Sequence, residues 1–305
     1  MNISTKADYL VFFCGLAMVF IGIWCYCSVR DRIFVFNMFG LSVKKEISDR
    51  ENIKTLRLSD YKVKETIIDI SDIYQMGTER DSKGKRIEND ANKLICNRIE
   101  AQCKQFSNRS RERKSCFTGM APIPYTILAG TYLTEGNTRR YFEYRKSNNS
   151  YYELRTKRKL LEKFQSIDAA FPEETDQNAS EIVVAVSITK NILDKDLEQF
   201  SSMPVVRISV ENPKDNLIES LPQLDTYTEL IMKTFEKIKG KYLEIHVIHL
   251  VASVPSCVSV ELGKKIYSST NRIPSIIAYH YVTNSNPRYP FGIYVTEDNK
   301  GKLVE

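Results

Sequence analysis

The stretch Leu243–Thr283 reads LEIHVIHLVASVPSCVSVELGKKIYSSTNRIPSIIAYHYVT. Its first part, Leu243–Leu250, is mostly aliphatic, which is typical of a strand buried in a sheet. Pro255 suits the start of a helix because proline has a fixed φ and lacks an N–H, and apolar residues follow at helical spacing. Ile273–Thr283, rich in Ile and Tyr, favours a second strand. This order predicts a right-handed βαβ unit on a parallel sheet.

A similar unit occurs earlier in the chain. The segment Cys116–Leu133 reads CFTGMAPIPYTILAGTYL, and a strand-like run, RRYFEYR, comes after it. Ala121–Pro124 (APIP) lines up with Ala252–Pro255 (ASVP), and Gly130 stands near the position of Gly263. Gly263 would allow its helix to pack closely on a sheet. A repeat this long is not a solenoid period and suggests a duplicated domain.

These two turns and the strands around them resemble a SAVED domain. Two further segments agree with that resemblance: Thr66–Ser71 (TIIDIS) is similar to the family's first strand, and Glu181–Thr189 (EIVVAVSIT) is similar to the strand that opens its second half. The resemblance covers Tyr61 to Val295. It implies a fusion of two CARF-like Rossmann-type units that senses cyclic oligonucleotides in bacterial anti-phage systems (CBASS) and in some CRISPR-linked effectors.

The expected fold is therefore α/β, with two fused CARF-like units, each a parallel sheet flanked by helices, behind an N-terminal transmembrane helix. We expect a transmembrane helix at 9–29, a juxtamembrane connector at 30–60 and a SAVED sensor domain at 61–298. The halves of the sensor would be 61–172 and 180–298, divided at the acidic, polar stretch PEETDQNAS. Apolar residues at helical spacing predict helices at 90–106, 157–171 and 222–239.

Tyr9–Val29 carries no charged residue over 21 positions. As a helix it would be about 31 Å long, enough to cross the hydrocarbon core of a bilayer. A cleaved signal peptide is the alternative, but the apolar run is long for one and no clean cleavage site follows it. Four basic residues follow the run and one precedes it, which favours a single-pass inner-membrane protein with its carboxyl-terminal domain in the cytoplasm.

A second apolar run, Ile33–Val43 (IFVFNMFGLSV), is too short to span a membrane. A helix lying on the membrane surface, a re-entrant segment and a continuation of the anchor region are the three interpretations.

Composition and charge limit which ligands, cofactors and partners we expect. The formal net charge of +6 suits an anionic ligand or lipid headgroups, and a solvated basic surface explains it equally well. Seven scattered cysteines, an odd number, argue against a disulfide framework and favour a reducing compartment. No spacing resembles a zinc site, so we expect no metal and no cofactor, and we do not expect DNA as a partner.

Candidate site residues lie where strands end and helices begin, because parallel sheets bind ligands there and helix N-termini suit phosphates. Four such turns lie at 71–72, 121–125, 187–190 and 252–256, and all four can face one pocket if the two halves pack as a pseudo-dimer. Cations would contact phosphates, tyrosines would stack on bases, and hydroxyl groups would bind base edges; capping and solvent-facing roles remain the alternative for each side chain. The candidates are Ser71, Asp72, Pro122, Pro124, Tyr125, Arg139, Tyr144, Arg145, Ser187, Thr189, Lys190, Ser253, Pro255 and Ser256.

The sequence contains no G-x-S-x-G, H-E-x-x-H or Walker motif, so we do not expect an enzyme. The resemblance implies a membrane-anchored receptor of cyclic oligonucleotides made by a CD-NTase-type nucleotidyltransferase. Ligand binding would drive homo-oligomerisation, and the tethered helices would then disrupt the lipid bilayer. The alternatives are a membrane-anchored Rossmann-like enzyme, such as a nucleotide-sugar transferase, and a passive protein-binding scaffold.

Overall fold

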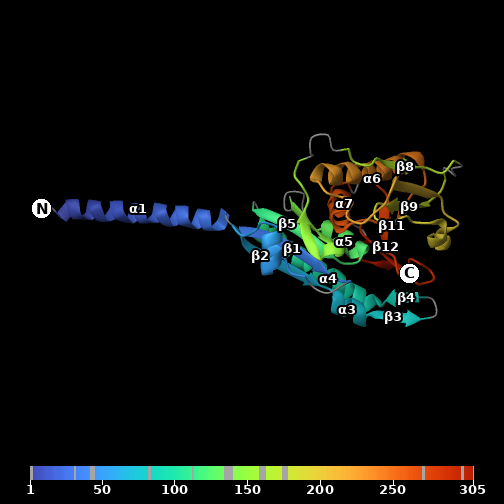
Figure 1. Ribbon diagram of the computed structural model, residues 1–305, viewed down its shortest axis with the longest axis horizontal. Helices are drawn as coiled ribbons and strands as arrows, with labels where there is room; N and C mark the ends of the chain where they lie inside the picture. Colours follow the sequence, from blue (N-terminus) through green and yellow to red (C-terminus); the bar gives the residue numbers. More distant parts are fainter. Residues whose placement is uncertain are drawn as a thin grey trace.

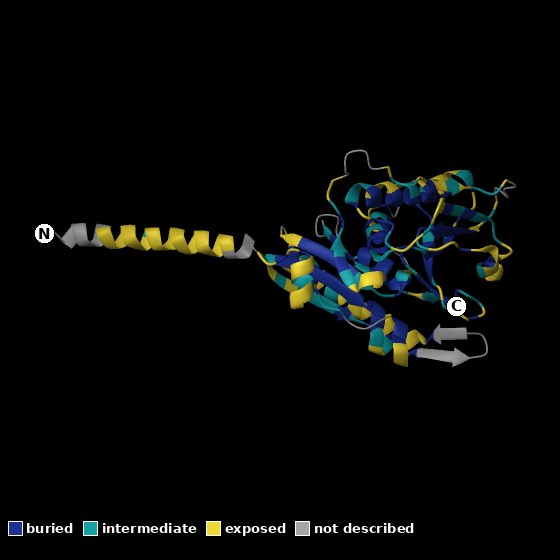
Figure 2. Ribbon diagram, viewed as in Figure 1, coloured by how far each residue is buried: buried dark blue, intermediate teal, exposed yellow. Residues whose placement is uncertain are grey.

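A single long helix leads into a folded head. The computed structural model describes residues 3–30, 32–41, 45–81, 84–111, 113–133, 140–157, 163–173, 178–269, 272–296 and 299–304. Helix α1 (Ile3–Arg30) projects away from the head, and its apolar window, Tyr9–Cys27, is exposed along its length (Figures 1 and 2). By length and composition, this helix is able to cross a membrane.

The head contains two large sheets. The first has the strand order β2-β1-β5-β6-β7, and the second has the order β14-β13-β12-β11-β9-β10-β8. The strands of the first sheet are β1 (Arg32–Phe39), β2 (Lys62–Asp69), β5 (Lys114–Met120), β6 (Arg140–Arg145) and β7 (Ser150–Glu153). Those of the second are β8 (Ile167–Ala170), β9 (Glu181–Ser187), β10 (Val205–Val210), β11 (Val247–Ser253), β12 (Ser275–His280), β13 (Phe291–Tyr294) and β14 (Leu303–Val304).

Helices form a layer between the two sheets. The largest cluster of buried apolar side chains joins the inner faces of both sheets to α4 (Asn89–Ser110), α5 (Ile123–Gly130), α6 (Leu221–Lys241) and α7 (Ser256–Ser268). Smaller clusters cover the two outer faces. The remaining elements are α2 (Arg50–Thr55), α3 (Ser71–Met76), a hairpin of β3 (Thr78–Asp81) and β4 (Gly84–Ile87), and the short 3₁₀ turns at 146–148, 194–196 and 198–200.

Five strands of each sheet follow the same plan. In the first sheet β2, β1, β5 and β6 are parallel and β7 is antiparallel. In the second sheet β10, β9, β11 and β12 are parallel and β13 is antiparallel. The βαβ unit expected from the opening stretch is β11–α7–β12, and its earlier counterpart is β5–α5–β6. All parallel strands within one sheet therefore end at one edge, which we call its carboxyl edge.

The expectation that residues 30–60 form a connector is wrong for β1. Arg32–Phe39 is a strand between β2 and β5, and none of the three membrane-associated interpretations of this run is correct for it. The physical reason is burial on both faces: Ile33, Val35 and Phe36 are fully buried, and a strand covered on both sides is a continuous apolar run rather than an alternating one. Thr66–Asp69 accordingly lies in β2, the second strand in chain order, and Ser71 begins α3.

Two of the three expected helices are confirmed. Helix α4 covers the pattern at 90–106, and α6 covers the pattern at 222–239. The expectation for 157–171 is wrong at its carboxyl end, where β8 pairs with β10; residues 158–162 lie outside the described part of the chain. Pairing with a neighbouring strand overrides the helical spacing of a few apolar residues.

Candidate ligand-binding site

We call the part of the head built on the first sheet the first half and the part built on the second sheet the second half. The two meet through a pair of glycines on α5 and α7. A Cβ atom added at Gly263 would lie 2.1 Å from the carbonyl oxygen of Ile127, and one added at Gly130 would lie 2.2 Å from that of Val260. Only glycine allows the two backbones to approach this closely. Gly263 thus packs against the other helix rather than against a sheet, and the crossing holds the two helices that follow β5 and β11 in direct contact.

Glu143 of β6 caps the amino terminus of α7. Its Oε1 accepts hydrogen bonds from Oγ of Ser256 at 2.9 Å and from the backbone N–H of Cys257 at 2.6 Å. A helix amino terminus favours a negative group because its first N–H groups lack partners within the helix. The sequence predicts that a ligand phosphate binds at this helix terminus. In the structure the Glu143 carboxyl group of the first half occupies that position.

A second polar contact is made from the face of β6 that carries Glu143. Tyr141 donates a hydrogen bond to Oε2 of Glu261 and accepts one from Nζ of Lys264 at 2.7 Å, while Lys264 is 3.1 Å from the same Glu261 oxygen. Burial raises the pKa of the Glu261 carboxyl, but the Lys264 ammonium and the Tyr141 hydroxyl more than offset it and hold that pKa below its usual range. These side chains join β6 of the first half to α7 of the second.

The carboxyl edges also touch at another point. The ring of Tyr74, on α3, meets the ring of His280, at the end of β12, edge-to-face with 5.8 Å between centroids. Since α3 follows β2 directly, this contact and the one made by Glu143 bring the ends of strands from both sheets together. Both contacts lie at the carboxyl edges, where the sequence predicts the candidate turns.

In the second half, the turn after β9 is bound to the end of β11. The N–H groups of Ile188 and Thr189 both donate to the carbonyl oxygen of Ser253, and the two hydroxyl groups, Thr189 Oγ1 and Ser253 Oγ, lie 2.8 Å apart. Ser187 is buried, and its Oγ accepts a hydrogen bond from the backbone of Ile192. Lys190 is exposed beside this pair. Thr189, Lys190 and Ser253 therefore form the cluster that is accessible to a ligand.

In the first half, local contacts occupy the expected groups. The hydroxyl and the N–H of Ser71 both donate to Asp69 Oδ1, and Asp72 is exposed on α3. Pro122 caps α5 and its ring packs against Gly40, where a Cβ would lie 2.8 Å from Pro122 Cδ. Pro124 is buried in the first turn of that helix.

Neither tyrosine assigned to base stacking faces the shared end of the head. Tyr125 is fully buried, and its hydroxyl donates to Asn92 Oδ1 at 2.9 Å. Tyr144 follows Glu143 on the strand and so points to the opposite face, where it packs edge-to-face on Tyr151 and accepts a hydrogen bond from Lys45. Both stacking assignments are therefore wrong.

Two arginines and the start of α7 complete the set of candidates. Arg145 shares the face of Glu143, two residues nearer the carboxyl edge, and its guanidinium lies 4.7 Å from the ring centroid of Tyr152. Arg139 lies outside the described residues. Helix α7 begins at Ser256 with Pro255 as its N-cap, one residue later than proline at the first helical position would give.

Sequence reasoning missed four residues at these turns. Gly40 and Leu41 follow β1, and their N–H groups bind the carbonyl oxygen of Met120. Arg98 of α4 donates to the carbonyl oxygen of Asp69, and the N–H of Lys214 donates to that of Ile188. Gly40, which follows the apolar run of β1, could have indicated in the sequence that a turn begins at Gly40 and Leu41. No local signal marks the last two, because distant segments bring them to the edge.

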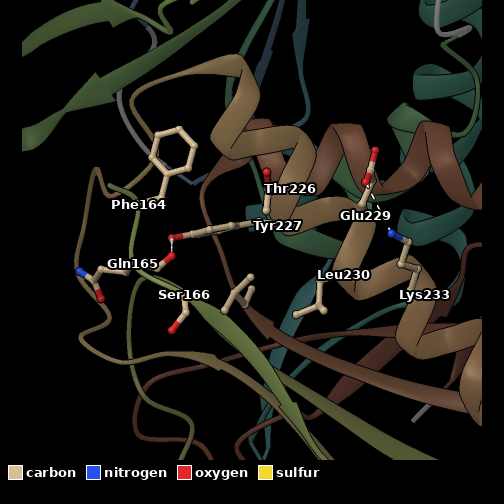
Figure 3. A pocket seen from close by; sticks show the side chains of 9 residues that line it. Phe164, Gln165, Ser166, Thr226, Tyr227, Glu229, Leu230 and Lys233 are labelled. Atoms are coloured by element: carbon tan, nitrogen blue, oxygen red, sulfur yellow. Dashed lines mark hydrogen bonds and ion pairs between the residues drawn. The ribbon is translucent and has the colours of Figure 1, made fainter. Parts of the chain in front are cut away.

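Two cavities among the described residues lie away from these turns. One, of about 360 Å³, lies between β8 and α6, where the Tyr227 hydroxyl donates to the carbonyl oxygen of Gln165 at 2.9 Å (Figure 3). The other, of about 440 Å³, lies between α4 and residues 299–302. None of the fourteen candidate residues lines either cavity, and no three His, Cys, Asp or Glu side chains gather into a metal site within the described ranges.

Glu143 gives the junction between the halves a pH dependence. Burial raises the pKa of its carboxyl more than the hydrogen bonds from Cys257 and Ser256 lower it. The unfolded chain therefore loses this proton at a lower pH than the folded chain, and the free energy of unfolding falls as pH rises from about 4.5 through the folded pKa, by up to about 1.4 kcal/mol per pH unit. Glu143→Gln keeps an acceptor and cannot ionise, so we expect chemical denaturation from pH 4.5 to 8 to show a smaller decline in the variant.

Glu143→Ala is the control for the hydrogen bonds themselves. It removes the acceptor for the N–H of Cys257 and the hydroxyl of Ser256, so we expect a loss of about 1–3 kcal/mol at every pH. Parallel pH curves for the wild type and Glu143→Gln would contradict a buried carboxyl group at this position.

Comparison with known proteins identifies the family and the fold. Residues 99–295 match the model of the SMODS-associated and fused to various effectors sensor domain, SAVED. An Acinetobacter baumannii Cap4 SAVED/CARF-domain receptor with the cyclic trinucleotide 3'3'3'-cAAA aligns at a TM-score of 0.53 and 16% identity, over 89% of this chain and 52% of that one. The same receptor with 2'3'3'-cAAA aligns at 0.53 and 17%, over 95% and 56%.

This chain thus spans about half the length of the solved receptors that it resembles, and no curated protein matches it. Because the family model covers more than half of the chain, and the solved receptors share its fold, the protein belongs to the SAVED family of sensor domains.

Proposed function

We propose that this protein is a membrane-anchored receptor for cyclic oligonucleotides in bacterial anti-phage defence. The observation that carries the proposal is the meeting of the two carboxyl edges in a SAVED domain, which brings hydroxyl and cationic side chains to one end of the head. Open parallel sheets bind ligands at that end. The solved Cap4 receptor with a similar fold holds a cyclic trinucleotide, which supports this class of ligand.

The proposed site uses both halves of a duplicated domain. The shared order and direction of five strands support two fused CARF-like units, with a boundary near 172–180 and a first unit that includes β1. Arg98 and Arg145 on one side, with Lys190 and Lys214 on the other, would bind phosphate groups. Thr189 and Ser253 would bind base or ribose edges.

Activation is proposed to act through the anchor. A CD-NTase-type nucleotidyltransferase would supply the ligand, and ligand-bound heads would associate into homo-oligomers. Helix α1, exposed and apolar over Tyr9–Cys27, would hold the protein in the inner membrane with the head in the cytoplasm. Gathering of these helices would disrupt the bilayer.

Ligand binding is tested by thermal unfolding of the full chain in detergent micelles with cyclic di-, tri- and tetranucleotides. A ligand at 100 times its Kd adds about 2.7 kcal/mol to the free energy of unfolding, so we expect one class of ring to raise Tm by several degrees. Loss of charge-assisted hydrogen bonds in the double variant Thr189→Ala, Lys190→Ala should weaken binding at least tenfold.

Lys233→Ala is the matched control, because Lys233 is an exposed cation of α6 beside the cavity that lies away from the turns. It should leave the affinity unchanged. Folded protein that no ring stabilises would contradict the receptor and favour a protein-binding scaffold. Turnover of a nucleotide sugar would favour the membrane-anchored enzyme instead.

A further inference from the structure

The first sheet begins almost directly at the end of the membrane-spanning helix. Helix α1 ends at Arg30 and β1 begins at Arg32, so one residue separates them. From Cys27, the end of the apolar window, the chain can carry Arg32 at most about 12 Å. The headgroup layer of one leaflet is roughly 5–8 Å thick. If α1 spans a bilayer, the beginning of β1 is held at or just above the headgroups.

Strand register places a row of cations at that level. Arg32 pairs with Lys62 on one side, and its successor Ile33 pairs with Lys114 on the other, with Arg113 just before Lys114. Neighbouring strands are about 4.8 Å apart. Three adjacent strands therefore present four basic side chains within about 10 Å across the edge where their amino ends meet. We call this the basic edge.

These cations are not neutralised within the described part of the protein. Lys62, Arg113 and Lys114 are exposed, and none of them forms an ion pair with a described carboxylate. The guanidinium of Arg113 lies 5.3 Å from the ring centroid of Phe34, and Lys114 donates to the Tyr61 hydroxyl at 3.1 Å. Both contacts orient the side chains, and neither partner carries a negative charge.

Arg140 of β6 shows the contrasting case. It lies further from the anchor, paired with Cys116, and it binds both carboxylate oxygens of Glu153. The last turn of α4 adds Arg109, and the residue that caps this helix adds Arg111; both are exposed. Around the basic edge the sequence offers fewer acids than bases, namely Asp31, Asp60 and Glu112.

We propose that the basic edge is a docking surface for the headgroups of anionic phospholipids. This inference rests on α1 being the membrane anchor, as in the proposed function, and adds a lipid preference and a fixed attachment of the head. Each Lys or Arg close to an anionic bilayer favours contact by about fivefold. The candidate turns that follow the first sheet lie at the opposite ends of these strands, so docking leaves them facing away from the membrane (Figure 1).

Hydrogen exchange of the full chain in lipid nanodiscs tests the proposal. Discs of phosphatidylcholine alone are compared with discs containing about 30% phosphatidylglycerol. We expect amides of 57–64 and 107–114 to exchange at least threefold more slowly in the anionic discs. The triple variant Lys62→Gln, Arg113→Gln, Lys114→Gln should lose this difference, as should the wild type in 0.5 M NaCl, since salt screens exposed charges.

The matched control neutralises three exposed lysines of α6 instead, Lys233→Gln, Lys237→Gln and Lys239→Gln, and should keep the lipid difference. Unchanged exchange in strand β11 shows that each variant remains folded. Equal exchange of the basic edge in both kinds of disc overturns the docking surface while leaving the anchor intact. A chain that does not stay with the discs refutes the anchor, and the docking surface with it.

Discussion

A fragment that begins at Lys45 is expected not to fold, whereas one that begins at Arg32 is expected to unfold in a single cooperative transition. The shorter fragment lacks β1, which lies between β2 and β5 and carries the buried side chains Ile33, Phe34, Val35, Phe36, Met38 and Phe39. Burial of each such side chain contributes about 1.5–3 kcal/mol. Their sum is comparable with the whole stability of a domain, about 5–15 kcal/mol.

Circular dichroism and size-exclusion chromatography show whether each fragment folds and whether it unfolds cooperatively. The fragment from Arg32 is the control, because it differs from the fragment from Lys45 by little more than β1. A cooperative transition at the same temperature in both fragments would show that β1 is not a central strand, and would restore residues 30–60 as a connector.

Gly263→Ala is expected to lower the free energy of unfolding by about 2–4 kcal/mol. Its new Cβ would lie 2.1 Å from the carbonyl oxygen of Ile127, which is backbone and cannot rotate away. Overpacking of this kind typically costs about 1–3 kcal/mol, and more where backbone must move. The helical preference for alanine, worth about 1 kcal/mol, opposes the loss only in part.

Gly240→Ala is the matched control, since Gly240 also lies in a long helix and a Cβ there meets nothing within 4 Å. It should gain about 0.5–1 kcal/mol from helical preference alone. Chemical denaturation of the three proteins separates the two effects. A Gly263→Ala variant as stable as Gly240→Ala would mean that α5 and α7 do not cross at this glycine.

Sequence patterns located the repeated βαβ units well because each is local. The strand around Leu250 and the helix after Pro255 lie within one stretch, and the proline and the aliphatic run carry the signal. The run at Ile33 was misassigned for a physical reason. An apolar segment beside a candidate membrane-spanning helix and a strand buried on both faces have similar composition, and only the strands that flank β1 distinguish them. The strands that identify β1 pair with it from 30 and 81 positions further along the chain.

For the candidate site, the sequence could predict turns but not the positions of individual side chains. Thr189 and Ser253 meet as two hydroxyls across neighbouring strands, as a shared edge requires. Tyr144 was assigned wrongly because the alternation of a strand gives two faces but does not say which one meets the other half. The contact between Glu143 and Ser256 joins residues 113 positions apart, and no local pattern marks it.

The short connection between α1 and β1 also has a mechanical consequence. A pull on the helix acts along β1, and the hydrogen bonds to β2 and β5 on its two sides resist that pull in shear rather than one at a time. One intervening residue leaves almost no slack. A displacement of the head therefore reaches the helix over one intervening residue, whereas a long linker would absorb it.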